Sequence, residues 1–310
     1  MASGLPSVID LDAELAKLTM FRRTPHSTRE ETKGSVARLA SCRDGLLLAL
    51  KSAGTDHWER HLTGDELVHV LEGSTTLEVV CDDGPPKSFI LGAGMIAVVP
   101  QSAWHRSHSE GNTHLGLTPF PGEHDERDVD DPRRGRKPEE KRESRAPDIV
   151  DLNAEVAKLT VFQGRTPRST MADRQGSAAR LASYRDGALT ATKFAGKGHW
   201  EKHIADELIH ILDGMATLDI AGEDGPQSLA LRAGMMTVIP QGTWHRFRSA
   251  EGVTLMTATP FPSETIEDDL DDPRTVESKG LAHRPADDLG QADEYPASGI
   301  ERRRSKADNL

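Results

Sequence analysis

The stretch HWERHLTGDELVHVLEG at residues 57–73 returns, with few changes, as HWEKHIADELIHILDG at residues 199–214. The segments around it return in the same order. GSVARLASCRDG (34–45) matches GSAARLASYRDG (176–187), and GAGMIAVVPQSAWHR (92–106) matches RAGMMTVIPQGTWHR (232–246). The units of solenoid proteins are only about 20–50 residues long, so a repeat of this length is a whole domain. The sequence therefore predicts an internal duplication, with two copies of one domain in tandem.

The repeat also sets the predicted domain boundaries. The first domain covers residues 1–123 and the second covers 149–274, because VIDLDAELAKLTMF at residue 8 returns as IVDLNAEVAKLTVF at residue 149 and DDPR returns at 271–274. Residues 124–148 are charged and almost free of apolar side chains, which predicts a solvated linker. Residues 275–310 show no usable hydrophobic period, so we expect a largely disordered tail. We expect each DDPR segment to hold the end of one domain against its neighbour.

The composition excludes several classes of partner. The 50 Asp and Glu residues outnumber the 38 Lys and Arg residues and give a net charge of −12, whereas proteins that bind nucleic acid need a basic face. The N-terminus lacks the basic start and apolar run of a signal peptide, and no stretch reaches the roughly 18 apolar residues of a membrane span. Cys42 and Cys81 have no counterparts in the second repeat, so no disulfide framework is implied. We expect a cytoplasmic protein with no nucleic-acid or membrane partner.

The sequence within each repeat predicts β-structure. Short apolar runs such as SVARLA, LLLALKSA, ELVHVL and MIAVV are separated by turn sequences rich in Gly, Pro and Asp. Many short strands with such turns favour an antiparallel sandwich or barrel. One short helix is expected at the start of each repeat, because Asp10 or Asp12 can cap it and Leu11, Leu15 and Leu18 share a face. The predicted fold class is therefore all-β.

The repeated stretch carries a set of potential metal ligands. Because alternate residues of a strand point the same way, His57, Glu59 and His61 share one face. Glu66 opens the next strand, and His105 ends a later repeated segment. The second repeat supplies His199, Glu201, His203, Glu207 and His245. Two imidazoles and a carboxylate from separate strands can form a facial set that binds a divalent transition metal and leaves coordination positions open.

These motifs resemble those of the cupin superfamily. The segment from His61 to Gly73 is similar to the first cupin motif, and the segment from Gly94 to His105 is similar to the second, except that Ser102 replaces an inner glycine. The resemblance covers roughly residues 30–120 and 170–262, so the chain looks like a bicupin, a tandem-duplicated cupin. It implies two tandem barrels of the jelly-roll type, also called double-stranded β-helices, each with a short N-terminal helical segment.

The resemblance implies a metal site in each barrel. Carried over position by position, the ligands are Glu59, His61, Glu66 and His105 in the first repeat, and Glu201, His203, Glu207 and His245 in the second. The family's pattern has a histidine where Glu59 and Glu201 stand. These two glutamates are either ligands or general bases, and they are the candidate catalytic residues. His57 and His199, two residues earlier on the same face, are possible substitutes for the missing imidazole.

The implied metal is a divalent ion. Fe(II) is preferred, because two histidines and one carboxylate are the ligands of non-haem iron oxygenases, and Mn, Ni and Zn are alternatives. The predicted function is a metal-dependent dioxygenase (an oxidoreductase) that acts on a small oxygen-chelating substrate, either aromatic or diketone-like. The alternatives are a metal-dependent decarboxylase or isomerase, and a cupin that binds or senses a small molecule without chemistry. A hydrogen-bonded polar cluster without metal is the structural alternative for the same residues.

Other repeated polar residues have structural explanations. Along their strands, His69 and His210 point to the opposite face from the motif glutamates Glu66 and Glu207. We therefore expect them to face a packing surface outside the barrel interior. Arg38 and Arg180 could hold an anionic substrate, although a salt bridge is the commoner role of such residues. Because one chain already pairs two barrels, either a monomer or a homodimer is expected.

Overall fold

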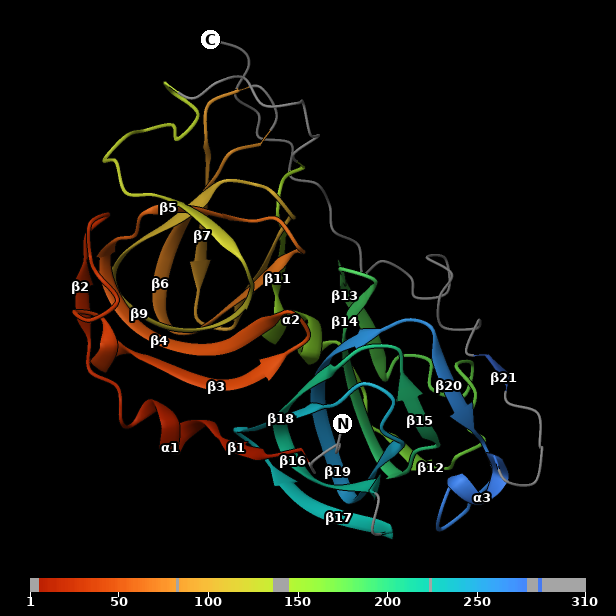
Figure 1. The fold of residues 1–310 in the computed structure, drawn as a ribbon. Coiled ribbons are helices and arrows are strands. Elements are labelled where there is room, and N and C mark those ends of the chain that lie inside the picture. Colours follow the sequence, from red (N-terminus) through yellow and green to blue (C-terminus); the bar gives the residue numbers. More distant parts are fainter. Residues whose placement is uncertain (1–5, 82–83, 136–144, 223–224, 278–283, 286–310) are drawn as a thin grey trace.

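The structure, a computed structural model, describes residues 6–81, 84–135, 145–222, 225–277 and 284–285. Within these residues the chain forms two β-barrels that lie side by side (Figure 1). The predicted all-β fold with two tandem barrels is therefore confirmed. The disordered tail predicted for residues 275–310 falls largely outside the described residues. Nowhere in the described chain is there a helix with the length and apolar character needed to cross a membrane.

The first barrel is a sheet of ten strands among the described residues. Its main path runs β10-β5-β9-β6-β8-β11; β4 pairs with β9 and also with β2 and β3, and β7 pairs with β6. The strands are β2 (Phe21–Arg23), β3 (Val36–Cys42), β4 (Gly45–Thr55), β5 (Trp58–His61), β6 (Glu66–Val79), β7 (Lys87–Gly92), β8 (Met95–Val99), β9 (His105–Pro119), β10 (Gly122–Asp125) and β11 (Asp148–Asp151). A single 3-10 turn, η1 (Lys33–Ser35), precedes β3.

The second barrel repeats this plan in a sheet of eleven described strands. Its main path runs β1-β18-β16-β19-β15-β20-β21, with β14 on β19 and β17 on β16. The strands are β1 (Val8–Asp10), β12 (Phe162–Arg165), β13 (Ala178–Tyr184), β14 (Gly187–Lys197), β15 (Trp200–His203), β16 (Glu207–Gly222), β17 (Gly225–Arg232), β18 (Met235–Ile239), β19 (His245–Pro260), β20 (Ser263–Ile266) and β21 (Arg284–Pro285).

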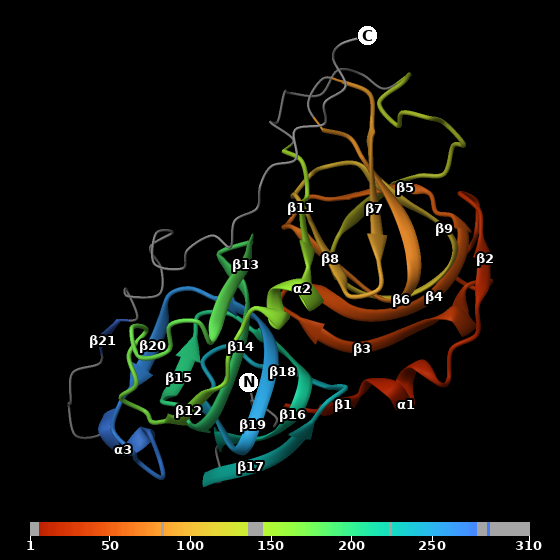
Figure 2. The ribbon, with the colours of Figure 1, turned by 180° about the vertical axis from the view of Figure 1, so that it is seen from behind.

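Each repeat gives its first strand to the other barrel. β1 comes from the first repeat but pairs antiparallel with β18 of the second, with Ile9 opposite Met236. β11 comes from the second repeat but pairs with β8 of the first, with Val150 opposite Ile96. Figures 1 and 2 show this exchange from both sides, with red β1 at the second barrel and green β11 along the first. The predicted boundaries at 1–123 and 149–274 place β1 in the first domain and β11 in the second. Strand pairing instead places β1 in the second barrel and β11 in the first.

Short helices follow the exchanged strands, as the sequence predicts. They are α1 (Leu11–Leu15) and α2 (Leu152–Ala157), and a third, α3 (Arg274–Glu277), lies near the end of the second repeat. Asp10 caps α1, because its Oδ1 accepts the Ala13 N–H at 3.1 Å, and Asp151 caps α2 in the same way. An aspartate side chain at this position satisfies one of the unpaired N–H groups that begin a helix.

Because side chains alternate in direction along a strand, one strand contributes side chains to two different apolar clusters. Along β6, Val68 and Val70 lie in a cluster inside the first barrel, while Leu67 faces the other barrel. Side chains of both repeats that point this way form one apolar layer, which we call the inter-barrel core. Its buried members are Ile9, Leu11, Cys42, Leu47, Ala49, Leu67, Ile96, Val98, Leu115, Leu117, Val150, Leu152, Leu181, Ala182, Tyr184, Leu189, Ala191, Leu208, Met236, Met256 and Ala258.

The described part of the predicted linker is not purely solvated. Residues 126–135 return onto the first barrel, where the Trp58 Nε1–H donates to the Val129 carbonyl at 2.9 Å. The Val129 side chain packs against Trp58, Val80 and Trp104. One apolar residue in a charged stretch is thus enough to fix the start of the segment to the barrel. Residues 136–144 lie outside the described residues.

The DDPR segments hold the barrel to which they belong. Arg133 donates to the Gly84 carbonyl at 2.6 Å, and Arg274 donates to the Gly222 carbonyl at 2.6 Å. Each arginine is oriented by the aspartate two residues earlier. The expectation that these segments join neighbouring barrels is therefore wrong, because each arginine reaches a loop of its own repeat.

Candidate metal centre

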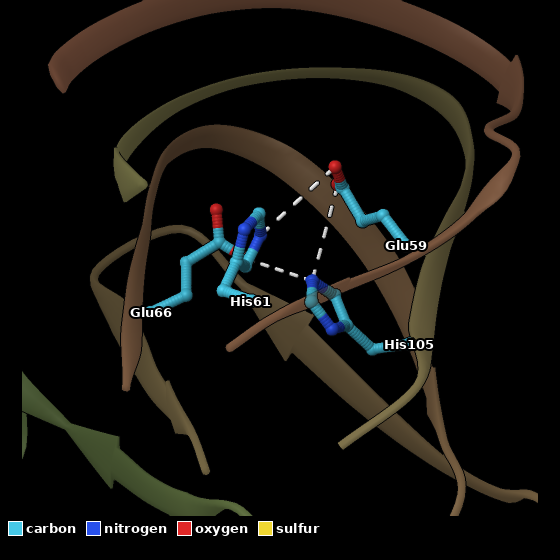
Figure 3. A group of neighbouring side chains, drawn as sticks. All are labelled: Glu59, His61, Glu66 and His105. Atoms are coloured by element: carbon cyan, nitrogen blue, oxygen red, sulfur yellow. Dashed lines mark hydrogen bonds and ion pairs between the residues drawn. The ribbon is translucent and has the colours of Figure 1, made fainter. Parts of the chain in front are cut away.

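Three strands bring four polar side chains together inside the first barrel. β5 supplies Glu59 and His61, and Glu66 and His105 are the first residues of β6 and β9. His61 Nε2 lies 3.3 Å and His105 Nε2 lies 2.7 Å from Glu66 Oε2. Glu59 stands on the opposite side, 4.0 Å from His61 Nε2 and 3.9 Å from His105 Nε2 (Figure 3). One ligand atom from each of the four residues lies within 4.8 Å of every other.

The second barrel brings its counterparts together in the same way. His203 Nε2 lies 3.3 Å and His245 Nε2 lies 3.0 Å from Glu207 Oε2. Glu201 Oε1 lies 3.9 Å from His245 Nε2. The structure thus assembles all eight predicted positions into two clusters, and their role as metal ligands stays a prediction.

The turn before each last histidine is tied to the strand of the earlier one. The Ser102 N–H donates to the His61 carbonyl at 2.8 Å, and the Gly242 N–H donates to the His203 carbonyl at 2.9 Å. Ser102 has a φ of 69° and Gly242 a φ of 74°. The replacement of the motif's glycine by Ser102 therefore changes the residue but keeps the left-handed turn that places His105.

Threonines orient the buried carboxylates. Thr118 Oγ1 donates to Glu66 Oε1 at 2.5 Å, and Thr259 Oγ1 donates to Glu207 Oε1 at 2.5 Å. With one oxygen engaged in this way, each carboxylate turns its Oε2 toward the two histidines. Such outer hydrogen bonds commonly fix the orientation of metal ligands.

Backbone carbonyls decide which nitrogen of the last histidine carries hydrogen. His105 Nδ1 lies 3.0 Å from the Ala103 carbonyl, and His245 Nδ1 lies 3.0 Å from the Thr243 carbonyl. Because a carbonyl only accepts, Nδ1 carries the hydrogen and Nε2 of the neutral ring is an acceptor. His105 Nε2 and the Glu66 carboxylate would then be two acceptors in contact. Such a contact requires a positive charge, either a proton or a metal ion.

Several atoms of the clusters are buried without a hydrogen-bond partner. They are the Nε2 atoms of His61, His203 and His245 and the Oε2 atom of Glu207. Buried polar atoms in folded proteins almost always have partners, so a group of orphans facing one point needs an explanation. A divalent cation fits, because imidazole nitrogen and carboxylate oxygen are its usual ligands.

The electrostatics of the clusters also favour a cation. Burial alone raises the pKa of Glu59, but the neighbouring His57 and the other nearby imidazoles bring the pKa down to about 2. Burial lowers the pKa of His105, but the hydrogen bond and charge of Glu66 raise it to about 9. Without metal, the two carboxylates are therefore balanced by protons on the imidazoles. A divalent ion supplies the same positive charge from a single atom.

A cavity of about 80 Å³ opens beside the second cluster, lined in part by Glu201 and Glu207. Thr190 and Thr192 line it, whereas the first repeat has Leu48 and Leu50 at these places in the strand pairing. The two barrels therefore carry similar clusters in different surroundings, with threonines in the second barrel at two places where the first has leucines.

Two arginines also line this cavity, and the sequence analysis missed them. Arg165 lies over the Phe194 ring at 4.5 Å, and Arg174 comes from the turn before β13. The repeated sequence RTP at 23–25 and 165–167 could have drawn attention to Arg165. Arg38 and Arg180 are instead engaged with serines of their own strands, Arg38 Nη2 with Ser41 at 2.8 Å, and neither lines the described cavity.

His57 and His199 stand behind the candidate catalytic glutamates. His57 Nε2 lies 3.8 Å from Glu59 Oε2, and His199 Nε2 lies 3.5 Å from Glu201 Oε2. Neither histidine belongs to the cluster of its barrel. The geometry therefore does not make them substitutes for the imidazole missing from the motif.

Each barrel contacts the other barrel's site region through an arginine. The Arg43 backbone N–H donates to Asp206 Oδ2 at 2.6 Å, and Arg43 Nε donates to the Asp206 carbonyl at 3.3 Å. Asp206 directly precedes the buried glutamate of β16, and its Oδ1 accepts the Gln241 N–H at 2.9 Å. Arg185 repeats these contacts on Asp65 of the first barrel. The two sites are thus braced crosswise.

We expect Arg43→Ala to weaken metal binding in the second barrel by about tenfold, the lower end of the effect of outer hydrogen-bond partners. Arg185→Ala should do the same to the first barrel, so each variant is the control for the other. Metal titrations are made in His105→Gln and His245→Gln backgrounds, in which only one barrel keeps its full ligand set. Equal losses in both barrels would show that the arginines act only on general stability.

Comparison with a protein-family model supports the fold. Residues 193–258 match the cupin domain family. No curated protein sequence matches this chain. Among solved structures, the chain is similar to a cupin 2 conserved barrel domain protein from Leptotrichia buccalis, with 11% identity and a TM-score of 0.48 over 83% of this chain and 98% of that one. It is also similar to oxalate decarboxylase from Bacillus subtilis, with 11% identity and a TM-score of 0.46 over 74% and 73% of the two chains. Identities this low do not carry an activity from those proteins to this chain.

Proposed function

Because this chain is a two-barrel protein of the cupin superfamily, we propose that each barrel binds a divalent metal ion and that the chain is a metal-dependent dioxygenase. The observation that carries the proposal is the group of buried Nε2 atoms without partners around Glu66 and Glu207. We further propose a small oxygen-chelating substrate, a cytoplasmic location, and a monomer or homodimer as the functional form.

The ligands would be His61, Glu66 and His105 in the first barrel and His203, Glu207 and His245 in the second. Two histidines and one carboxylate are the set used by non-haem Fe(II) enzymes, and Mn, Ni or Zn would also fit. The bound ion would polarise the oxygen atoms of a chelating substrate and, as Fe(II), mediate electron transfer from the substrate to O2. No further reductant is needed, since both oxygen atoms enter the substrate and the substrate supplies the electrons.

Glu59 and Glu201 would act as general bases. Each is less buried than the ligand carboxylate of its barrel, and Glu59 stays ionised at neutral pH because its pKa lies at about 2. An ionised carboxylate can accept the proton of a substrate hydroxyl whose acidity the metal has raised. His57 and His199 lie behind these carboxylates, 3.8 Å and 3.5 Å from them.

The second barrel would bind anionic substrates more tightly than the first. Arg165 and Arg174 line its cavity, and a guanidinium group matches the two oxygens of a carboxylate. In the first barrel, Arg23 is paired with Asp56 at 2.8 Å. A carboxylate-bearing chelator, such as a salicylate, is therefore the preferred class for the second barrel.

The test is oxygen uptake by the Fe(II)-loaded protein with catechols, salicylates, β-diketones and oxalate. We expect uptake with one chelating class, and about 10²-fold to 10⁴-fold slower uptake in a Glu59→Gln/Glu201→Gln double variant, the range of general-base contributions. Arg174→Thr, which copies Thr32 of the first repeat, should raise the apparent KM for an anionic substrate. A finding that neither barrel binds metal would rule out every metalloenzyme function.

A second candidate is metal-assisted proton transfer without O2, as in an isomerase or a decarboxylase. The pair formed by His199 and Glu201 favours it, because the His199 Nε2 atom is buried without a partner 3.5 Å from the carboxylate. Such a pair can take a proton at one position and return it at another. Metal-dependent turnover under strict exclusion of O2 would select this function over dioxygenation.

A further inference from the structure

A second group of potential metal ligands lies at the edge of the first barrel's site. It consists of His57 at the start of β5, Glu59 within β5, and His124 on β10, which pairs with Glu59 across the two strands. His57 Nε2 lies 2.7 Å from His124 Nδ1, and Glu59 Oε2 lies 3.8 Å and 3.9 Å from these two nitrogens. Three donor atoms of metal-binding type therefore face one another.

These separations match a single bound ion. Three atoms at the measured distances are all about 2.1 Å from one common point, which is the length of a bond from zinc to imidazole nitrogen or carboxylate oxygen. The two rings meet edge to face, with centroids 4.6 Å apart and planes at 75°, so their nitrogen atoms rather than their faces approach each other. His124 is partly exposed, which leaves room for water as a further ligand.

Glu59 belongs to both groups in the first barrel. Its Oε1 lies 3.9 Å from His105 Nε2, and its Oε2 faces His57 and His124. Glu59 Oε2 thus lies between the two sets of imidazoles, since it is also 4.0 Å from His61 Nε2.

The second barrel lacks one member of this group. His199 and Glu201 correspond to His57 and Glu59, but Thr265 pairs with Glu201 on β20 where His124 pairs with Glu59 on β10. No group of potential ligands forms there among the described residues besides Glu201, His203 and His245. At this place the two barrels thus differ in a single residue, which is His124 in the first and Thr265 in the second.

We propose that His57, Glu59 and His124 form a second divalent-metal site, of the type that binds Zn²⁺, at the mouth of the first barrel only. The full chain then binds about three ions rather than about two, with Glu59 as a ligand of the additional ion, and the general-base role falls to Glu201 of the second barrel. The site goes beyond the proposed activity and does not depend on it. It gives the first barrel a paired centre and the second barrel a single one.

The test measures bound Zn²⁺ per chain by equilibrium dialysis and elemental analysis of the full-length protein. His124→Thr copies the second barrel and is expected to lose one equivalent, while Thr265→His is expected to gain one. His108→Thr removes an exposed histidine of the same barrel, which lies beside Glu110 and Thr55, and should change nothing. Thermal unfolding of each variant verifies that the fold is kept.

The outcomes separate this site from the proposed function. Unchanged stoichiometry in His124→Thr overturns the second site, and no gain in Thr265→His overturns the claim that this histidine alone distinguishes the barrels. Failure of the proposed function has another signature, because then a His105→Gln/His245→Gln variant binds as much Zn²⁺ as the wild type. If both proposals hold, that double variant keeps about one ion per chain, and adding His124→Thr removes it.

Discussion

Replacement of His105 and His245 by glutamine is expected to weaken metal binding in both barrels by at least about 100-fold, since loss of even an outer partner costs 10–100-fold. Glutamine is the appropriate replacement, because its amide can still donate to Glu66 and Glu207 and so avoids leaving a buried carboxylate without a partner. In the His124→Thr background, the metal content measured by elemental analysis should fall from about two ions per chain to a small fraction of one.

The control for this experiment is His114→Leu. His114 is another histidine of β9, bound to Asn112 at 2.6 Å, and the second repeat has Leu255 at the equivalent place in the sheet. Its replacement should leave the metal content unchanged. Full metal content in the His105→Gln/His245→Gln variant would exclude both clusters as metal sites and leave them as hydrogen-bonded polar groups.

The second large effect is expected from two histidines beside the inter-barrel core. His69 and His210 are both buried, with ring centroids 5.9 Å apart, and the Nδ1 atom of each has no partner. Burial lowers the pKa of His69 to about 3, with a contribution from His210, and burial lowers that of His210 to about 4. The sequence prediction of a packing surface agrees with this placement.

Acidification should therefore destabilise the fold through this pair. Above about pH 6.5, both rings are neutral in the folded and the unfolded chain, and they contribute nothing to the pH dependence. Below it, the unfolded chain binds protons that the folded chain does not, so the free energy of unfolding falls with pH until the folded pKa values are reached. By about pH 5 the loss is about 2 kcal/mol for each histidine.

Denaturant unfolding from about pH 7.5 to about pH 5 measures this effect in the wild type and in a His69→Gln/His210→Gln variant. The histidines of the metal clusters are present in both proteins, so their contribution cancels in the difference. The two stability curves should diverge by about 4 kcal/mol toward acid pH. Parallel curves would show that the inter-barrel core accepts the protonated rings.

Strand periodicity explains why much of the architecture is visible in the sequence. Alternation along β5 and β6 puts Glu59, His61 and Glu66 on one side and His69 on the other, and no long-range information is needed to see this. Because the domain is duplicated, each of these sequence patterns occurs twice in the chain. The convergence of His105 with Glu66 does not follow in this way, because the two residues begin antiparallel strands and His105 lies opposite Val79. It depends on the closure of the barrel through β5, where Glu59 lies opposite His105.

The sequence does not reveal which strand pairs with which edge of the two sheets. Nothing in Val8–Asp10 tells whether its partner is β8 or β18, since both edges offer the same alternation. His124 escapes notice because it has no counterpart in the second repeat and stands in a charged stretch. Arg174 is hidden for the same reason, with Thr32 in its place. Features that differ between the repeats are those that a repeat-based analysis discounts.

The exchange of β1 and β11 has a consequence for the origin of the molecule. In a chain with one repeat, the same exchange between two copies would give a symmetric dimer with swapped strands. Joining two copies makes that association intramolecular and raises the effective concentration of each half around the other to the millimolar range. Assembly then no longer depends on how much protein a cell makes, and either half is free to diverge. The arginine-lined cavity of one barrel and the extra histidine of the other are differences that a dimer of identical chains could never have fixed on one side alone.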